Sequence, residues 1–475
     1  MEPTNELQQL ANKLSSKDYW GAYFKNQYYF RINTRRYLHE LNLHPGYTFL
    51  DETIQRQLQN ENLPALFHEF LHYLHEVSTV TGNISMGLSL TMKACFTSWL
   101  DKDLASARSE GMAAANARID EYVKAWTTMS VIDGTDKQVI KGKMDGVLHL
   151  DWEEQPTEFA SDQGYKVMPI KVPKIKFIDR FEGLEYHNTL LFGKFYLYEG
   201  LAYELDRIVD KQHYQREKIY DVHNMTEYTV LRQLAKHLFK TITKETFLSL
   251  AVLALQYLNA GEMFIFLVNE VKGNVAKGIS QQATIKTIKA RVSTMLSKSR
   301  NDYIDAQEEY VTLYAGRPQL QVGFRFIADE NKRLYDERIK NPCFEIDLIF
   351  AGQFQNLLDK LKVCDYMYEF KDEETYLRDF IGTSLEEEIS QSLKALIAYD
   401  DYYFSHKGLS TEQVEKEAHE CPFFTTCHLQ HRTDHADICG NTPWRIFEIN
   451  QKTDKKFCWY GTGVGQAKSQ VATKP

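Results

Sequence analysis

Residues 63–80, LPALFHEFLHYLHEVSTV, constrain the fold of this chain more than any other segment. Phenylalanine and leucine flank His68 and His72 on both sides, so an α-helix formed here must be largely buried. Pro64 suits the first turn of such a helix, where its missing amide hydrogen is not needed. Buried histidines require polar partners. The segment therefore predicts a core helix over residues 63–80 with a polar site built into it.

His68, Glu69 and His72 form the pattern His-Glu-x-x-His in this helix. Because helical residues advance by about 100° each, histidines four positions apart lie about 40° apart on successive turns. Their imidazole nitrogens can then reach one metal ion, while Glu69 projects beside them without joining the ligands. A glutamate in that position can serve as the general base for a metal-activated water. The alternative interpretation is a set of core histidines that are hydrogen-bonded to protein groups.

A catalytic zinc ion needs a third protein ligand and a position open to water. His75 is near in sequence, but on a straight helix it lies about 10.5 Å from His68, too far to share one ion. The better candidate is Glu199 in FGKFYLYEGLAYELDRIVD, where small residues follow it and allow another helix to pack closely. Asp206 shares the helical face of Glu199. Glu204, one turn after Glu199, and His75 stay open as alternative ligands.

The strings HEFLH and YEGLA resemble the gluzincin branch of zinc metallopeptidases, in which a glutamate on a second helix completes a His-His-Glu site. The string FHEFLHYLHEVSTVTG is also similar to a group of poorly characterised bacterial HExxH proteins. The resemblance implies that His68, His72 and Glu199 bind Zn²⁺ and that Glu69 is the general base. The implied activity is that of a zinc-dependent endopeptidase acting on a protein or peptide substrate.

Two other classes of function stay open on the same residues. The chain could be a non-catalytic binding or scaffold protein with structural metal sites, or a zinc hydrolase of a non-peptide substrate. Glu69 separates the scaffold from the enzymes, because a structural metal site closes its fourth position with protein and has no use for a base.

Two further features of a peptidase site can be sought in the sequence, an oxyanion donor and a strand that pairs with the substrate. The oxyanion of a tetrahedral intermediate needs a hydrogen-bond donor. Tyr198, Tyr203 and His187 are all near Glu199 in sequence, and nothing selects among them. Residues 165–178, YKVMPIKVPKIKFI, alternate as a strand does. They predict either a sheet edge along which an extended peptide lies or a strand with a purely structural role.

The remaining patterns predict an α+β fold that is mostly helical. Residues 147–152 read as a strand, residues 153–164 as a loop, and residues 343–350, CFEIDLIF, as a further strand. The most apolar stretch, residues 247–268, predicts a buried helix rather than a membrane span, because polar residues and Glu262 interrupt it.

The resemblance implies a zincin-like core, in which the HExxH helix faces the Glu-bearing helix across a cleft with a small sheet beside it. We expect this core over residues 1–298, with an insertion at about 93–190. A helical region follows at 299–410, then a Cys/His-rich segment at 411–448 and a polar tail at 449–475. The glycines and polar residues from Gly461 onward predict disorder.

The Cys/His-rich segment holds Cys421, Cys427 and Cys439 with histidines between them, and Cys458 follows. Thiolate and imidazole are preferred zinc ligands, so a second, structural metal at Cys421, Cys427 and Cys439 is one interpretation. An iron–sulfur cluster that includes Cys458 is a variant of it. Reduced cysteines packed in a loop, or cysteines that form a regulatory disulfide, are the alternatives.

Charge and cysteine usage limit the partners and the compartment. The formal net charge of −9 argues against binding to nucleic acid or to an anionic membrane, both of which need a basic surface. The amino terminus lacks the basic start and apolar core of a secretory signal. Seven cysteines without the regular spacing of a disulfide framework favour reduced thiols. We therefore expect a cytoplasmic protein.

Overall fold

The computed structural model describes most of the chain, namely residues 21–24, 29–33, 67–100, 112–134, 143–161, 164–181, 184–214, 226–353, 356–357, 366–369, 377–379, 386–406, 419–423, 433–453 and 458–468. These residues are mostly helical and include a small three-stranded antiparallel sheet and a second sheet of four short strands. The predicted α+β class is therefore confirmed.

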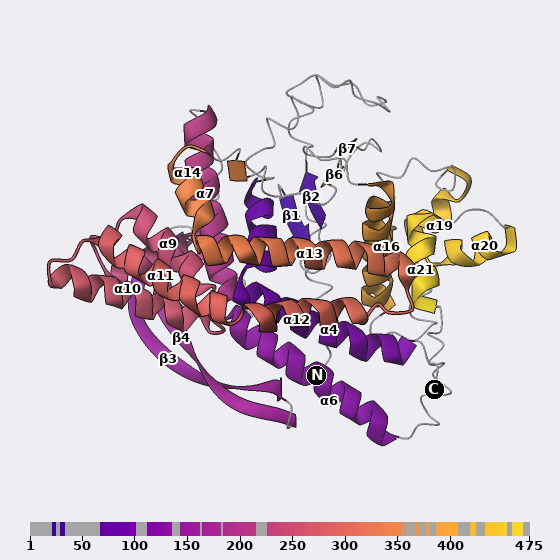
Figure 1. The fold of residues 1–475 in the computed structure, drawn as a ribbon, viewed down its shortest axis with the longest axis horizontal. Helices are drawn as coiled ribbons and strands as arrows, with labels where there is room; N and C mark the ends of the chain where they lie inside the picture. The colour runs from indigo at the N-terminus through magenta and orange to yellow at the C-terminus, as the bar shows by residue number, and fades with distance from the viewer. Residues whose placement is uncertain are drawn as a thin grey trace.

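A helix over residues 67–78 carries the His-Glu-x-x-His pattern, and we call it the motif helix. The labelled helices of Figure 1 are α4 (Val80–Leu100), α6 (Met112–Asp133), α7 (Lys194–Tyr214), α8 (Thr226–Leu238), α9 (Lys244–Ala254), α10 (Ala260–Ala276), α11 (Gln281–Lys298), α12 (Arg300–Thr312), α13 (Pro318–Lys340), α14 (Phe344–Phe350), α16 (Glu387–His406), α19 (Ala436–Asn441), α20 (Arg445–Thr453) and α21 (Trp459–Lys468). Helices α12 and α13 run side by side across the middle of the molecule, and α16 and α21 pack together at one end (Figure 1).

The three-stranded sheet consists of β3 (Lys143–Ser161), β4 (Gly164–Phe181) and β5 (Leu184–Leu191), all antiparallel. Its order is β3-β4-β5, so β4 is the central strand. The predicted strand at 165–178 is confirmed. Of its two predicted roles the sheet edge is wrong, because both sides of β4 are paired, and the structural role stands. The predicted loop at 153–164 is also wrong. Its residues as far as Ser161 extend β3, in which Pro156 stands opposite Pro169 of β4. β3 is an edge strand of this sheet, and edge strands tolerate proline.

The second sheet joins β1 (Gly21–Phe24) and β2 (Tyr29–Asn33) to β6 (Tyr366–Glu369) and β7 (Leu377–Asp379). β2 and β6 are parallel, and the other two pairings are antiparallel. This sheet brings the amino-terminal part of the chain beside residues that follow α14.

The apolar stretch at 247–268 forms two helices rather than the single one predicted. α9 ends at Ala254 and α10 begins at Ala260, where the Asn259 side chain accepts a hydrogen bond from the Glu262 amide. That N-cap stabilises a new helix start, which explains why polar residues interrupt the apolar pattern. No helix among the described residues is both long and apolar enough to cross a membrane.

Residues 344–350 form α14, so the strand predicted there is wrong. The Asn341 side chain accepts a hydrogen bond from the Cys343 amide just before the helix begins. Phe344, Ile346 and Ile349 are all buried, because α14 contacts neighbouring helices on more than one face. Burial on several faces gives an apolar run that resembles a buried strand.

The expectation of disorder from Gly461 onward is wrong as far as residue 468. These residues belong to α21, in which Val464 is fully buried. A Cβ added at Gly463 would lie 2.6 Å from the Cβ of Ala398 on α16. Glycine is required here because the two helices approach too closely for a side chain.

One large hydrophobic core extends from the motif helix through α7 to α13 and α16. A second cluster lies at the carboxy-terminal end, where α16 and α21 meet the segment that contains Cys421. The motif helix is one of the most buried elements of the large core, since Phe67, Leu71 and Leu74 are fully buried. The site that it carries is therefore held by the core and not by surface loops.

Candidate metal centre

The motif helix ends at a sharp bend that its own hydroxyl groups stabilise. Thr79 Oγ1 donates a hydrogen bond to the His75 carbonyl oxygen at 2.5 Å and accepts one from the Gly82 amide at 3.1 Å. A Cβ on Gly82 would lie 2.1 Å from the Glu76 carbonyl oxygen, so only glycine allows this close approach. The bend fixes the direction in which α4 leaves the motif helix.

His68, His72 and Glu199 converge from the motif helix and α7. The Nε2 atoms of His68 and His72 lie 3.5 and 3.4 Å from Glu199 Oε2. Within the described part of the chain, this is the one group of His, Cys, Asp or Glu residues that could hold a metal ion, with donor atoms all within 4.8 Å of one another. The two imidazoles of the His-Glu-x-x-His pattern therefore meet at one point with Glu199, the residue favoured as third ligand.

The donor set suits a zinc ion in chemistry, and its two distances to Glu199 suit one in spacing. In a tetrahedral site with bonds of about 2.0–2.1 Å, the ligand atoms lie about 3.3–3.4 Å apart. The distances to Glu199 Oε2 are close to that separation. The side chains of His68, His72 and Glu199 are 12, 9 and 20% exposed, so the cluster is largely but not completely buried.

Asp206 holds the other side of the His68 ring. It lies on α7 two turns after Glu199, and its Oδ2 atom is 3.1 Å from His68 Nδ1. This bond orients the ring so that Nε2 faces Glu199. A carboxylate on the far nitrogen of a ligand histidine fixes its tautomer and makes it a stronger base toward a metal. The shared helical face of Asp206 and Glu199 was visible in the sequence, but the role of Asp206 was missed.

The carboxylates around the cluster favour positive charge at its centre. Burial acts to lower the pKa of His68, but hydrogen bonds to Asp206 and Glu199 and the charge of Glu69 raise it to about 10. Burial acts to raise the pKa of Glu199, yet His72 and His68 hold it well below its usual range. A metal cation can supply the same positive charge in place of the proton on the ligand histidine.

Glu69 and Tyr228 border the cluster. Glu69 is buried, and its charge acts directly on His68. Tyr228, on α8, presents its ring edge to His68 with the ring centroids 5.8 Å apart. Sequence reasoning missed Tyr228, because α8 gave no signal that it would meet the motif helix.

The alternative ligands are engaged elsewhere. Glu204 binds Arg232 at 3.1 Å and Lys244 at 2.6 Å. His75 Nε2 lies 3.2 Å from Glu345 Oε1. Neither residue belongs to the converging group.

The three predicted oxyanion donors lie in different surroundings. The Tyr198 ring stacks on His72, and its hydroxyl lies 3.5 Å from Thr79 Oγ1 in the buried bend. The Tyr203 hydroxyl accepts a hydrogen bond from Arg207 Nη1 at 2.9 Å. His187 is exposed on β5. The contacts of Tyr198 and Tyr203 suit structural roles better than that of an oxyanion donor.

The carboxy-terminal cysteines do not form a second group of this kind among the described residues. Cys421, Cys439 and Cys458 are buried and form no disulfide, and the Cys421 amide donates to the Cys439 carbonyl oxygen at 2.8 Å. Burial raises the pKa of the Cys421 thiol. Cys427 lies outside the described residues, so the structural metal predicted at Cys421, Cys427 and Cys439 stays a prediction.

No family model matches this chain, and no curated protein and no solved structure matches it either. The chemistry assigned to the centre therefore rests on its own residues. The gluzincin resemblance of the two motifs stays a prediction.

Proposed function

We propose that the protein is a zinc-dependent endopeptidase that hydrolyses peptide bonds in protein or peptide substrates. The observation that carries the proposal is the convergence of donor atoms from His68, His72 and Glu199 within 4.8 Å of one another, with both histidine nitrogens 3.4–3.5 Å from the Glu199 carboxylate. Among the described residues the group has three protein donors, which would leave a fourth tetrahedral position for water.

Each residue has one role in the proposed reaction. His68 and His72 would hold zinc through their Nε2 atoms and Glu199 through a carboxylate oxygen, while Asp206 orients His68. When bound, zinc supplies a Lewis acid that polarises the scissile carbonyl. Glu69 accepts a proton from the attacking water and transfers it to the leaving amine nitrogen.

The proposal extends to the fold and the compartment. The motif helix and α7 would form the two-helix metal-binding part of a zincin-like core, with the three-stranded sheet leading into α7 through β5. An extended peptide would pair with β3 or β5, which lie at the edges of the sheet. A cytoplasmic location, expected from the cysteine pattern, belongs to the same proposal.

Replacing the general base tests the activity. Glu69→Gln keeps the size of the side chain and removes its basicity, so we expect peptide hydrolysis to fall by about 10²–10⁴-fold with the zinc content unchanged. The measurement is cleavage of a broad peptide mixture by mass spectrometry, with bound zinc determined on the same samples.

The matched control is Glu270→Gln on α10, which removes an exposed ion pair with Arg291 and should leave cleavage unchanged. A zinc-loaded wild-type protein that cleaves no peptide in the mixture would contradict the peptidase assignment. Equal cleavage by the wild type and Glu69→Gln would contradict the role of Glu69.

A further inference from the structure

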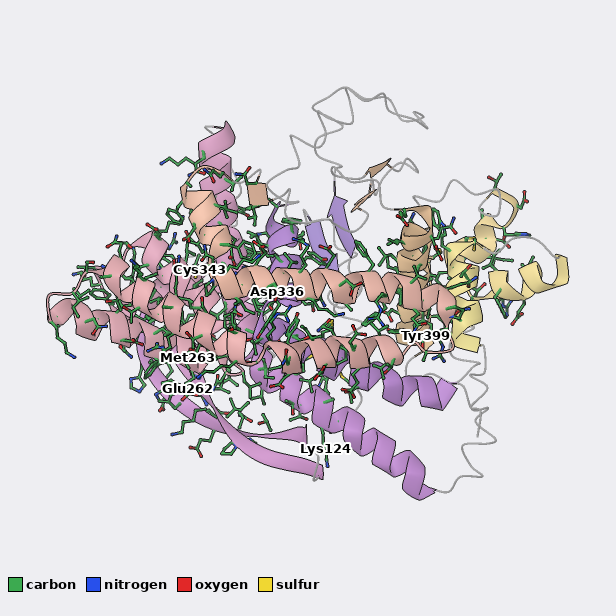
Figure 2. All side chains as sticks on the ribbon, in the orientation of Figure 1. Lys124, Glu262, Met263, Asp336, Cys343 and Tyr399 are labelled. Atoms are coloured by element: carbon green, nitrogen blue, oxygen red, sulfur yellow. The ribbon has the colours of Figure 1, made fainter. Side chains whose placement is uncertain are left out.

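A fully buried ionic network closes the carboxy-terminal end of the motif helix. Arg338 at the end of α13 donates through Nη1 to both carboxylate oxygens of Glu345 on α14, at 2.7 and 2.5 Å. Its Nε and Nη2 atoms donate to Ser78 Oγ at 3.1 and 3.0 Å, and Ser78 Oγ donates to the Leu74 carbonyl oxygen at 2.5 Å. His75 completes the network through Glu345. Figure 2 marks the region by Asp336 on α13 and Cys343 just before α14.

Stability alone is a weak reason for such a network. Arg338, Glu345 and His75 are all 0% exposed. Removing a guanidinium and a carboxylate from water costs about as much as their attraction returns, and apolar replacements of such pairs are often neutral or stabilising. The network does, however, fix the position of the Arg338 guanidinium at the carboxy-terminal end of the motif helix. The helix dipole favours positive charge at that end.

The network reaches the metal centre through two aromatic rings. The His75 ring lies 5.6 Å from the ring of Tyr198, and Tyr198 stacks on His72 at 6.3 Å. Tyr198 also directly precedes Glu199 in α7. Tyr198 therefore touches one metal-binding candidate through its ring and is joined to another by the backbone.

The His75 ring has a single hydrogen-bonding anchor. Its Nε2 atom is bonded to Glu345, and its Nδ1 atom has no hydrogen-bond partner among the described residues. Lys194 Nζ also lies over the Tyr198 ring, 5.5 Å from its centre, and binds Asp133 at 2.8 Å. The position of the Tyr198 ring thus depends on two buried charged groups, Glu345 by way of His75 and Lys194 directly.

We infer that His75, Glu345 and Arg338 are positioning residues for the metal centre, and that they act by holding Tyr198 against His72 and beside Glu199. The inference rests on the proposed zinc site. It adds that residues of α13 and α14, distant in sequence from both ligand helices, set the metal affinity and the ligand geometry.

His75→Phe is the direct test. Phenylalanine keeps an aromatic ring beside Tyr198 but loses the bond to Glu345, so the ring is no longer anchored. We expect affinity for Co²⁺ and Zn²⁺, measured by competition with a chelator, to fall by about 10-fold or more. We also expect the visible absorption spectrum of bound Co²⁺ to change, because that spectrum reports ligand geometry.

A matched control separates positioning from general stability. Gln307 is as buried as His75 and bonds to Asn83 and to Asn331 at 2.5 and 3.0 Å, away from the ligand residues. Gln307→Leu should lower the thermal midpoint of the metal-free protein but leave the Co²⁺ affinity and spectrum unchanged. If His75→Phe does not fold, His75→Gln replaces it, since its amide can still donate to Glu345 while the ring is gone.

The outcomes are distinct. Unchanged Co²⁺ affinity and spectrum in the folded His75 variant would overturn the inference and leave the zinc site intact. A wild-type protein that binds neither Co²⁺ nor Zn²⁺ would overturn the proposed function and the inference with it. A shift in both properties that is absent from Gln307→Leu would support the inference.

Discussion

At the level of single residues, the hydrogen bond between His68 Nδ1 and Asp206 decides which imidazole nitrogen faces Glu199. The bond is 3.1 Å long and the Asp206 side chain is buried. Glu199 and Asp206 come from one helix, so α7 supplies both a proposed ligand and the group that orients a second proposed ligand, His68. The metal affinity of the site should depend on Asp206 nearly as strongly as on the ligands.

Asp206→Asn should lower zinc affinity by about 10–100-fold, because the amide cannot make His68 as basic as the carboxylate does. Competition with a chelator measures this change. Asp336→Asn is the control, since it removes an exposed carboxylate that binds Arg300 far from the centre. Equal affinities of Asp206→Asn and the wild type would contradict the orienting role.

Glu345 gives a prediction for the dependence of stability on pH. Burial acts to raise its pKa, but Arg338 and His75 lower it to about 2. Its folded pKa lies below the unfolded value of about 4.3, so its contribution to stability is full above the unfolded pKa and is lost as the pH falls toward 2.

Glu345→Gln should therefore be less stable than the wild type at pH 7 by about 3–5 kcal/mol, because Arg338 is left without its carboxylate partner. The difference should shrink between pH 5 and pH 3, because Glu345 of the unfolded wild type takes up a proton near pH 4.3 while the folded carboxylate stays charged until the pH approaches about 2. Denaturant unfolding at the two pH values measures it. A difference that is constant over this range would show that the carboxylate charge is not the source of the stability.

At the level of elements, the bend after the motif helix depends on one glycine. Gly82→Ala should destabilise the protein by about 1–3 kcal/mol or more, because its Cβ would lie 2.1 Å from the Glu76 carbonyl oxygen and the backbone must move. Gly273→Ala is the matched control within α10, where an added Cβ meets nothing within 4 Å. It should stabilise the protein by about 0.5–1 kcal/mol. Thermal or denaturant unfolding measures both, and similar effects of the two changes would contradict this account of the bend.

The helical elements also show what local patterns can and cannot predict. The motif helix was predictable because its apolar flanks and the spacing of its histidines are properties of one segment. α14 was mistaken for a strand, because burial on several faces removes the helical periodicity from a short run. Gly463 was read as part of a disordered tail, although α21 needs glycine there to approach α16. In both wrong predictions, the deciding fact is the packing of a neighbouring helix, which the sequence of the segment itself does not show.

At the level of the whole molecule, the candidate centre combines residues that the sequence could indicate with others that it could not. His68, Glu69, His72 and Glu199 were chosen from local spacing and from small neighbouring residues. The anchoring of His75 by Glu345 joins residues far apart in the chain, and so does the bond from Arg338 to Ser78. Such pairs follow from how α13 and α14 pack on the motif helix, which no single segment encodes.

The large hydrophobic core joins the motif helix, α7, α13 and α16 in one cluster. The ligands therefore stand on helices whose positions depend on much of the chain. Cys421 and Cys458 belong to the separate cluster, so a metal bound there should be lost or kept independently of the His68 centre.

The central claim is that His68, His72 and Glu199 bind zinc, and metal content tests it most directly. Elemental analysis of the purified wild type, after reloading with zinc and removal of the excess, should give about one zinc ion per chain that His72→Ala lacks. His237→Ala, which removes an exposed histidine at the end of α8, should retain it. A wild type that cannot be loaded with zinc, or a His72→Ala variant that keeps all of it, would contradict the account.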